Sequence, residues 1–505
     1  YEIGACDWSS DVCPSDLDRG NLPPLGLLTV AALLPRAWPL RLVDLDVRPL
    51  TESDLAWAEV VLVGGMRVQS ASIHEVLARA RAAGVRAVLG GPAVTTAPEE
   101  YEDADVRFLG EAEGRAPELV EAMRRRDRLL LEAPATRPEL SASPVPRYDL
   151  VRRGDYRCLA LQTSRGCPHR CEFCDIIEIF GRRPRVKTAD QVLSELEVVF
   201  RGGFRGGLFI VDDIFIGHRR ATRALVRELG AWQRARGYPF ELFTEASVDL
   251  ARDADLTREM VEAGFVSVFL GIETPVLASL AGARKMQNLK LDLGEAIHTL
   301  TRAGLEVMAG FIVGFDEDDP SVFERQAAFI DAMPIPLAMV GLLNALPGTQ
   351  LWRRLRAEGR LRASSSGDQF LRPNFVPAMD EATLLSGYAD LLEHIYQPRA
   401  FFERCRRFLD AAGPRKTGFH PSLDGARALG RALYCFGLER PWRGEFWRTV
   451  FRGGKRSVEL GARGITHAYL GEHLIRYTHE QVVPSIRAAA TALRLERGPP
   501  ARALS

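Results

Sequence analysis

The sequence predicts an α/β protein in three parts: an N-terminal Rossmann-like domain, a partial (β/α)6 barrel and a C-terminal domain that is mostly helical. Two observations lead to this prediction. Short apolar segments alternate with segments of helical period over 20–125 and again over 157–350, which is typical of parallel sheets with crossover helices. After residue 350 the pattern of short apolar segments fades, and helical patterns dominate 351–505.

Composition restricts the class of protein. Of the 505 residues, 46% are apolar, and Lys+Arg and Asp+Glu are both 66. The chain is too apolar for a disordered protein, and zero net charge disfavours a nucleic-acid binder that relies on bulk charge. Eight Cys make no disulfide framework, so we expect a cytoplasmic protein. No apolar run approaches the ~20 residues of a transmembrane segment.

The first 19 residues stand apart. The stretch 6–17 resembles translated sequencing-adapter read-through and has no regular periodicity. We therefore expect 1–19 to be non-native, the native N-terminus to be missing, and Cys6 and Cys13 not to be ligands. A natural frayed terminus is the alternative.

In the N-terminal domain, 40–45, 60–63 and 87–89 are expected strands and 73–83 an amphipathic helix. Gly64-Gly65 and Gly90-Gly91 directly follow strands, at the carboxyl edge where open α/β sheets bind ligands. The stretch 126–156 is rich in Pro, Arg, Glu and Ser and is expected to be a linker.

Six further strands are expected in the barrel, with helices at 189–200 and 219–236 between them. The chemistry of such a barrel lies at the carboxyl ends of its strands. The expected strands are 158–164, 207–212, 240–246, 266–273, 305–313 and 337–344.

Three cysteines give the most specific chemical signal. Cys167, Cys171 and Cys174 are spaced C-x3-C-x2-C after an expected strand. Thiolates suit iron–sulfur clusters, which usually have four Cys ligands. Three on one loop predict a [4Fe–4S] cluster with one iron open to a substrate or cofactor. Zinc is the alternative, but it needs a fourth ligand, and only His169 lies inside the loop.

The C-x3-C-x-aromatic-C pattern, with Phe173 as the aromatic, resembles the radical S-adenosylmethionine (SAM) superfamily. The resemblance implies that SAM chelates the open iron and yields a 5′-deoxyadenosyl radical on reductive cleavage. It also implies SAM contacts at successive strand ends, although an Asp-Asp pair after a strand is more often a helix cap. The implied SAM-binding residues are Phe173, Asp212, Asp213, Glu245, Ser247, Glu273, Gly310 and Gly314.

The Rossmann-like domain ahead of this core resembles a cobalamin-binding domain, through Pro23-Pro24-Leu25-Gly26-Leu27 and its Gly-rich turns. Glycine lets the backbone approach a large flat corrin. No Asp-x-His-x-x-Gly is present, so we expect no protein His on cobalt. Relatives begin with a strand upstream, so the first strand is expected to be missing. A degenerate domain kept for packing is the alternative. The implied cobalamin contacts are Leu25, Gly26, Asp44, Gly64, Gly65, Gly90, Gly91 and Glu111.

Stretches at 285–288, 341–345, 347–349 and 374–377 resemble the subgroup that contains the hopanoid C-2 methylases. This implies a cobalamin-dependent radical SAM C-methyltransferase that methylates an unactivated carbon of a small molecule or polycyclic lipid through methylcobalamin. The alternatives are a non-methylating enzyme of the same architecture, such as a cyclase, and a cluster- or cobalamin-based sensor. A tRNA thiomethyltransferase is disfavoured because the sequence has no second Cys triplet.

The expected partners are the substrate and an external electron donor similar to flavodoxin or ferredoxin, with no nucleic acid. Residues 401–505 hold 19 Lys+Arg against 9 Asp+Glu, with Trp442, Phe446, Trp447 and Phe451 among them. Peripheral contact with anionic lipid is one interpretation, and a solvated helical face is the commoner one. His394 and Tyr396 either line the substrate cavity or, as we favour, pack in the core.

Overall fold

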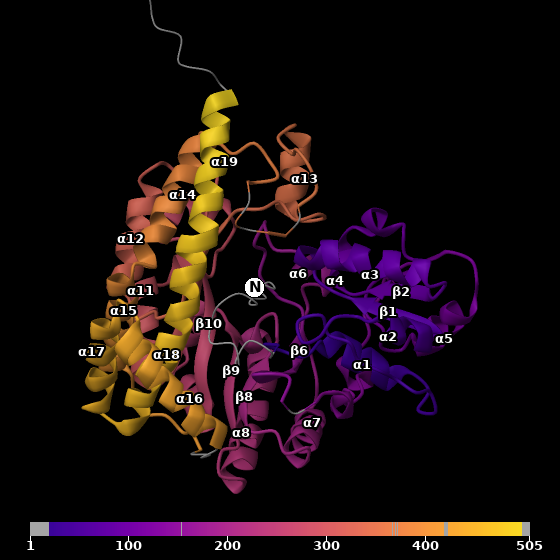
Figure 1. The fold of residues 1–505 in the computed structure, drawn as a ribbon, viewed down its shortest axis with the longest axis horizontal. Helices are drawn as coiled ribbons and strands as arrows, with labels where there is room; N and C mark the ends of the chain where they lie inside the picture. The colour runs from indigo at the N-terminus through magenta and orange to yellow at the C-terminus, as the bar shows by residue number, and fades with distance from the viewer. Residues whose placement is uncertain are drawn as a thin grey trace, which may run out of the picture.

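The computed structural model describes residues 20–152, 154–365, 367–368, 370, 372–418 and 423–496. The segment 1–19, with Cys6 and Cys13, lies outside them. Two parallel sheets lie side by side in the described chain, and a helical region covers the larger sheet on the side away from the N-terminal domain (Figure 1).

The smaller sheet is N-terminal and has the strand order β1-β2-β3-β4, with every pair parallel. Separate apolar clusters, one centred on Leu77 and one on Val106, pack against it. Its strands are β1 (Val60–Gly64), β2 (Arg86–Gly90), β3 (Val106–Phe108) and β4 (Leu129–Leu131), and its helices are α1 (Leu25–Leu33), α2 (Glu52–Trp57), α3 (Ser70–Ala82), α4 (Pro92–Thr96) and α5 (Ala116–Arg124).

Two expectations for this domain need comment. The strand expected at 40–45 is wrong, because this segment is irregular and ends in a turn. A strand needs a ladder partner for its backbone groups, and in the described residues β1 pairs only with β2. The stretch expected to be a linker contains β4, whose residues Leu129–Leu131 extend the N-terminal sheet.

The larger sheet is a six-stranded open half-barrel with the order β12-β11-β10-β9-β8-β5, again all parallel. All six expected strands and both expected helices are confirmed within a few residues. The strands are β5 (Cys158–Leu161), β8 (Gly206–Ile210), β9 (Phe240–Ala246), β10 (Phe265–Glu273), β11 (Glu306–Val313) and β12 (Ala338–Leu342), and the main helices are α7 (Ala189–Arg201), α8 (Arg219–Ala235), α9 (Ala254–Glu262), α10 (Leu277–Gly282), α11 (Leu293–Ala303) and α12 (Val322–Ala332).

The helical region packs on the open edge of this sheet. Tyr388 of α14 (Glu381–Ile395) and Tyr396, directly after this helix, donate hydrogen bonds to the carbonyls of Val340 (2.8 Å) and Ala338 (2.7 Å) on β12. Tyr396 therefore packs in the core, as favoured, whereas the imidazole of His394 lies 2.7 Å from Asp331 at the surface. The other helices are α13 (Gln350–Ala357), α15 (Pro398–Ala411), α16 (Leu423–Tyr434), α17 (Arg443–Gly454), α18 (Val458–Tyr477) and α19 (Val483–Glu496).

None of the helices in the described residues combines the length and the apolar character needed to cross a bilayer. The longest, α18, is 20 residues long, but it carries buried and exposed polar side chains along its length.

Candidate functional site

The three cysteines lie on a loop between two short strands, β6 (Ser164–Arg165) and β7 (Arg185–Val186), which pair antiparallel. At the base of the loop Gly166 has φ +98°, and a Cβ there would lie 2.9 Å from the carbonyl oxygen of Arg183. Its N–H donates to the carboxylate of Asp213 (2.7 Å), and the Cys167 N–H donates to the Gly181 carbonyl (3.1 Å). Only glycine fits this base without strain.

The far side of the loop is held by the barrel and by α13. The Glu172 N–H donates to the Ala283 carbonyl (3.1 Å), and the Leu351 N–H donates to the Glu172 carbonyl (2.8 Å). The Glu172 carboxylate, 6% exposed as a residue, also pairs with Arg354 (2.9 Å). The cysteine loop is thus fixed at both ends by backbone hydrogen bonds.

The thiols are close enough to influence one another. Burial, with a contribution from the charge on Cys171, raises the pKa of Cys167 to about 11. Burial likewise raises the pKa of Cys174 well above its ordinary value, with both other thiols adding to it. Because metal ligation requires thiolates, iron binding here must release protons. In the described residues no three His, Cys, Asp or Glu side chains are placed to hold one single metal ion.

A buried ion pair lies beside these thiols. The ammonium of Lys285 is 2.5 Å from the carboxylate of Glu273, which is the last residue of β10 and is 1% exposed. Burial opposes the charge on Lys285, but Glu273 and the nearby Cys171 together raise its pKa above the ordinary value. Gln287 completes this side, with its amide 3.7 Å from the sulfur of Cys171.

The backbone around that pair is specialised. Glu273 has φ +63°, a left-handed conformation that is uncommon outside glycine. A Cβ on Gly271 would collide with the Glu273 carboxylate and would lie 2.7 Å from the Lys285 ammonium. The Asn288 amide donates to the carbonyls of Gly271 (3.0 Å) and Ile272 (2.9 Å). Strained backbone of this kind concentrates at functional sites.

The two adjacent acids after β8 differ in their surroundings. The Asp212 carboxylate is 1% exposed and accepts hydrogen bonds from the N–H groups of Thr163 (2.6 Å) and Ser164 (2.9 Å) and from both hydroxyls. It therefore orients the segment that leads into the cysteine loop. Asp213 accepts the Gly166 N–H, and burial, with repulsion from Asp212 and Glu245, raises its pKa to about 7. Neither acid caps α8, whose N-cap residue is His218.

Of the remaining predicted SAM-binding residues, Ser247 and Gly314 directly follow strands, Gly310 lies within β11, and Phe173 lies on the cysteine loop. Ser247, just after β9, bonds to the Asp249 carboxylate. Gly310 on β11 lies opposite Gly271 on β10. Gly314 has φ +100°, and its N–H donates to the buried carboxylate of Asp318 (2.9 Å). Phe173 stands near Phe315, with ring centroids 6.2 Å apart. These strand ends surround the cysteine loop on the barrel side.

The glycines of the smaller sheet gather at its own carboxyl edge. Leu27 of α1 would lie 3.3 Å from a Cβ on Gly64, and a Cβ on Gly91 (φ +95°) would lie 3.6 Å from the backbone of Gly65. Gly26 faces open space, and the neighbouring Leu25 packs against the barrel core. Gly90 is the last residue of β2. At this edge Gly64 is exposed, whereas a Cβ on Gly65 would lie 3.0 Å from Ile73 and 3.1 Å from Gln69.

Two predicted cobalamin contacts have protein partners instead of open surroundings. The carboxylate of Asp44 accepts a hydrogen bond from the hydroxyl of Tyr156 (2.8 Å), at the start of the barrel. Glu111, after β3, is 7% exposed and pairs with Arg165 (2.7 Å) and Arg185 (2.8 Å). Glu113 pairs with Arg165 as well (2.8 Å).

Glu111, Glu113, Arg165 and Arg185 form a buried quartet that joins the two sheets. Arg165 lies two residues before Cys167, so two carboxylates of the N-terminal domain hold the base of the cysteine loop directly. Its charge is retained, since the two glutamates offset the cost of burial and raise its pKa. On the same side, α4 packs against α6 (Ile176–Ile179), which follows the loop. The carboxyl edges of both sheets therefore face the cysteine loop (Figure 1).

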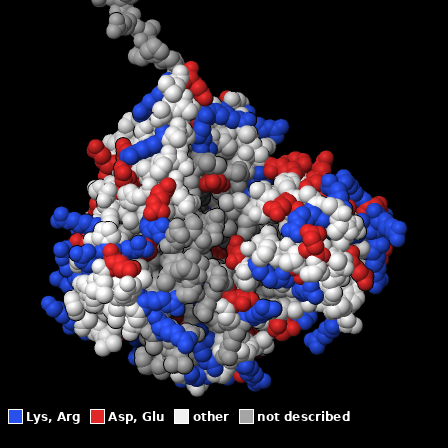
Figure 2. All heavy atoms as spheres, in the orientation of Figure 1, with Lys and Arg blue, Asp and Glu red and all other residues white. Residues whose placement is uncertain are grey.

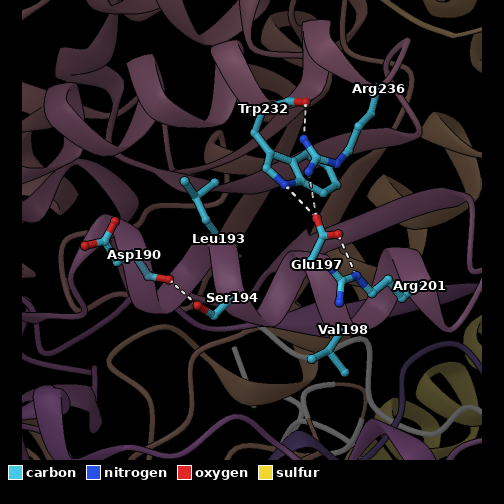
Figure 3. A pocket seen from close by; sticks show the side chains of 8 residues that line it. All are labelled: Asp190, Leu193, Ser194, Glu197, Val198, Arg201, Trp232 and Arg236. Carbon is cyan, nitrogen blue, oxygen red and sulfur yellow. Dashed lines mark hydrogen bonds and ion pairs between the residues drawn. The ribbon is translucent and has the colours of Figure 1, made fainter.

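The larger surface hollow lies away from this site. Its residues come from α7 and α8, on the outer surface of the barrel (Figure 3). Glu197 bridges Arg201 (2.8 Å) and Arg236 (2.9 Å), and Arg236 lies over the ring of Trp232. A second hollow lies after β12, where Asn344, Arg362 and Arg372 are among the residues that line it. Both arginines there pair with the buried Glu381 (2.9 Å each).

Sequence reasoning assigned no role to three charged residues of the site. Lys285 is one of only five lysines and lies in a stretch used for the family resemblance, a signal that was available. Arg165 and Arg185 had no such signal, because arginine is abundant in this chain and their acidic partner Glu111 is 54 and 74 residues away.

Comparison with known protein families gives three matches. The B12 binding domain matches residues 18–120, the Radical SAM superfamily matches residues 161–330, and a domain of unknown function (DUF4070) matches residues 349–485. The first two ranges contain the glycine-rich edge and the cysteine loop, respectively.

Two curated relatives match almost the whole chain. An uncharacterized methyltransferase of Synechocystis is 40% identical over 463 residues, which are 90% of this chain and 86% of the relative. The hopanoid C-2 methylase of Rhodopseudomonas palustris is 33% identical over 492 residues, which are 94% of this chain and 91% of the relative.

Among solved structures, the cobalamin-dependent SAM radical enzyme OxsB with aqua-cobalamin bound has the same fold. The TM-score is 0.59 at 14% identity, and the match covers 94% of this chain and 81% of that one.

Proposed function

Because the chain belongs to the family of cobalamin-dependent radical SAM methyltransferases, we propose that it methylates an unactivated carbon of a small molecule or polycyclic lipid. The observation that supports this proposal is the meeting of two unlike sheet edges at one cysteine loop, fixed by the quartet of Glu111, Glu113, Arg165 and Arg185. Methyl transfer to such a carbon needs a radical source and a methyl donor near one substrate, and these two edges supply a place for each.

The residues of the barrel edge suit the cluster and SAM. Cys167, Cys171 and Cys174 would hold a [4Fe–4S] cluster, and the ammonium of Lys285 beside them offsets the charge of their thiolates. Asp213 and Glu245 would face the amino group of SAM. Burial raises the pKa of Asp213 to about 7, so a cation bound beside it would favour its ionised form.

The glycine-rich edge suits cobalamin, because Gly64 is exposed and Gly65 and Gly91 are half-buried, so that a broad, flat ligand can approach their backbone. When bound, the cluster, SAM and cobalamin would supply an electron, a carbon-centred radical and a transferable methyl group. The protein would position these three groups and exclude water. The substrate would enter between the two edges, and the helical region would complete its cavity.

The test is anaerobic reconstitution with iron, sulfide and cobalamin, followed by addition of SAM, a reductant and a candidate polycyclic lipid. The SAM carries a labelled methyl group, and SAM-derived products and labelled lipid are measured together. S-adenosylhomocysteine and 5′-deoxyadenosine in comparable amounts, with label in the lipid, are expected.

Two controls give the result its meaning. Cys435→Ala alters a cysteine in the helical region and should leave both products unchanged, while Cys171→Ala should remove both. Formation of 5′-deoxyadenosine alone with every lipid and small-molecule acceptor offered would favour a non-methylating enzyme. Neither product, with the cluster shown to be present, would favour a sensor.

A further inference from the structure

Three large apolar side chains are exposed at one end of the helical region. Tyr434 is 57% exposed, Leu438 62% and Phe451 60%. Single exposed apolar residues are common and need no explanation, whereas a group of them marks an interaction surface. The question is therefore whether these three lie together.

Trp447 connects them. Its indole N–H donates to the carbonyl of Gly437 (2.9 Å), directly before Leu438. Its ring stacks on that of Phe451, with centroids 5.3 Å apart. Tyr434 and Leu438 are four residues apart on a continuous helical run, α16 followed by the π-helical turn at 435–439, so they face the same way. We call Tyr434, Leu438, Trp447 and Phe451 the aromatic face.

The segment that carries the aromatic face is rich in exposed basic residues. Among residues 427–456 whose side chains the structure describes, one acid, Glu439, is exposed, and the exposed basic residues are Arg427, Arg443, Arg448, Arg452, Lys455 and Arg456. Arg448 and Arg452 pair with Glu445 (2.5 Å) and Asp410 (2.7 Å). In Figure 2 the white surface at the lower left, over α16 and α17, is bordered by blue side chains.

We propose that the aromatic face and its basic border bind the surface of a bilayer that contains anionic lipid. The apolar side chains would enter the boundary between headgroups and acyl chains, and the arginines and Lys455 would bind the headgroups. A second copy of the chain is a poorer occupant, because it would bring the same positive charge against this surface. Highly charged nucleic acid would leave the apolar side chains without a partner.

This inference goes beyond the proposed function and does not depend on it, because it concerns residues outside the cysteine loop and both sheet edges. Binding is measured with neither SAM nor substrate present. Its failure would leave the methyltransferase proposal intact, and the failure of that proposal would leave this one standing.

The test is co-sedimentation of the full chain with two kinds of vesicle. One kind is phosphatidylcholine alone, and the other also contains about 30% phosphatidylglycerol, an anionic lipid. The wild type should bind the anionic vesicles at least about tenfold more tightly, and salt should weaken the binding. The double variant Leu438→Glu/Phe451→Glu should lose about tenfold or more in partition coefficient, since each change removes buried apolar area and adds an anion.

Leu495→Glu is the matched control. Leu495 is 77% exposed and lies near the end of α19, at the top of Figure 1 and far from α16 and α17. This variant should bind as the wild type does. Equal wild-type binding to both kinds of vesicle, or unchanged binding by the double variant, would overturn the proposal. So would a double variant that changes only the oligomeric state in size-exclusion chromatography.

Discussion

The two sheets present opposite chemistry at their carboxyl edges. The barrel edge carries buried charge: Asp212 accepts four hydrogen bonds, Asp213 has a raised pKa, and Glu273 pairs with Lys285. The N-terminal edge carries glycine, and at Gly91 the backbone has φ +95°. Charged side chains line one edge, and glycines that are exposed (Gly64) or half-buried (Gly65, Gly90 and Gly91) line the other.

The difference matches what each edge would hold. A small ligand with an amino and a carboxylate group is recognised by charged side chains, which fix its orientation through directed hydrogen bonds. A large planar ligand is recognised through van der Waals contact over its flat face, and a Cβ between the ligand and the backbone would reduce that contact. If both ligands bind as proposed, the quartet around Glu111 would set the position of one edge relative to the other.

The largest effect is expected from removing the three cysteine thiols of the loop that both edges face. The triple variant Cys167→Ala/Cys171→Ala/Cys174→Ala should lose iron and reduce SAM cleavage to background, because no thiolate remains to hold a cluster. Iron content and 5′-deoxyadenosine are the measurements. Cys435→Ala, in the helical region, should match the wild type in both. Cleavage that persists in the triple variant would contradict the assignment of these cysteines.

The next effect concerns the join between the edges. Glu111→Gln leaves the buried charges of Arg165 and Arg185 short of a carboxylate, which should cost about 3 kcal/mol of unfolding free energy. Urea denaturation of the apoprotein measures this cost. Glu118→Gln alters an exposed partner of Arg115 on the same domain and should cost less than about 1 kcal/mol.

The same variant separates positioning from stability. At a temperature where Glu111→Gln is folded, methyl transfer should fall more than 5′-deoxyadenosine formation, because the cysteine loop survives while its alignment with the N-terminal edge loosens. Equal loss of both products would mean that the quartet serves stability alone.

The sequence predicted the framework of both edges but not their connection. Strands ending in Gly64-Gly65 or Glu273 follow from local periodicity, and a parallel sheet brings their ends together. The partners of Glu111 do not follow, because ion pairs that span 54 and 74 residues leave no local pattern. The error at 40–45 has a related cause: an apolar alternation shows that a segment suits a strand, but only a neighbouring strand provides the ladder.

The charged edge also predicts a pH dependence that the glycine edge lacks. The pKa of Asp213 is raised from 3.8 to about 7, chiefly by burial. The folded apoprotein therefore holds this proton more tightly than the unfolded chain, so the stabilisation is complete below about pH 4 and is lost as pH rises through 7. Asp213→Asn should remove this loss, which is on the order of a few kcal/mol for a pKa raised from 3.8 to about 7.

Urea midpoints of the apoprotein between pH 4 and pH 8 measure the effect. Asp190→Asn, at an exposed position on α7, should leave the profile of the wild type unchanged. Saturating SAM should also flatten the wild-type profile if its amino group lies beside Asp213. A profile that is the same in Asp213→Asn and the wild type would place the titrating group elsewhere.

The smallest effect tests the glycine edge itself. Gly91→Ala and Gly84→Ala both place a Cβ on backbone of positive φ, +95° and +71°. Gly84→Ala should cost about 1 kcal/mol of stability. Gly91→Ala should cost about 1–3 kcal/mol, because Gly91 has ψ −173° and so lies in a region that essentially only glycine adopts. Only Gly91 lies at the carboxyl edge, where its Cβ would stand 3.6 Å from the backbone of Gly65; around Gly84 there is open space.

A spectroscopic titration with hydroxocobalamin, at a temperature where both variants are folded, should therefore show which glycine the corrin approaches. Gly91→Ala is expected to bind several-fold more weakly than the wild type, and Gly84→Ala is expected to bind equally well. Equal binding by both would show that the corrin does not approach this turn. Cobalamin would then have to bind elsewhere, for example at the barrel edge. The assignment of cobalamin to the N-terminal edge and of SAM to the barrel edge would be wrong.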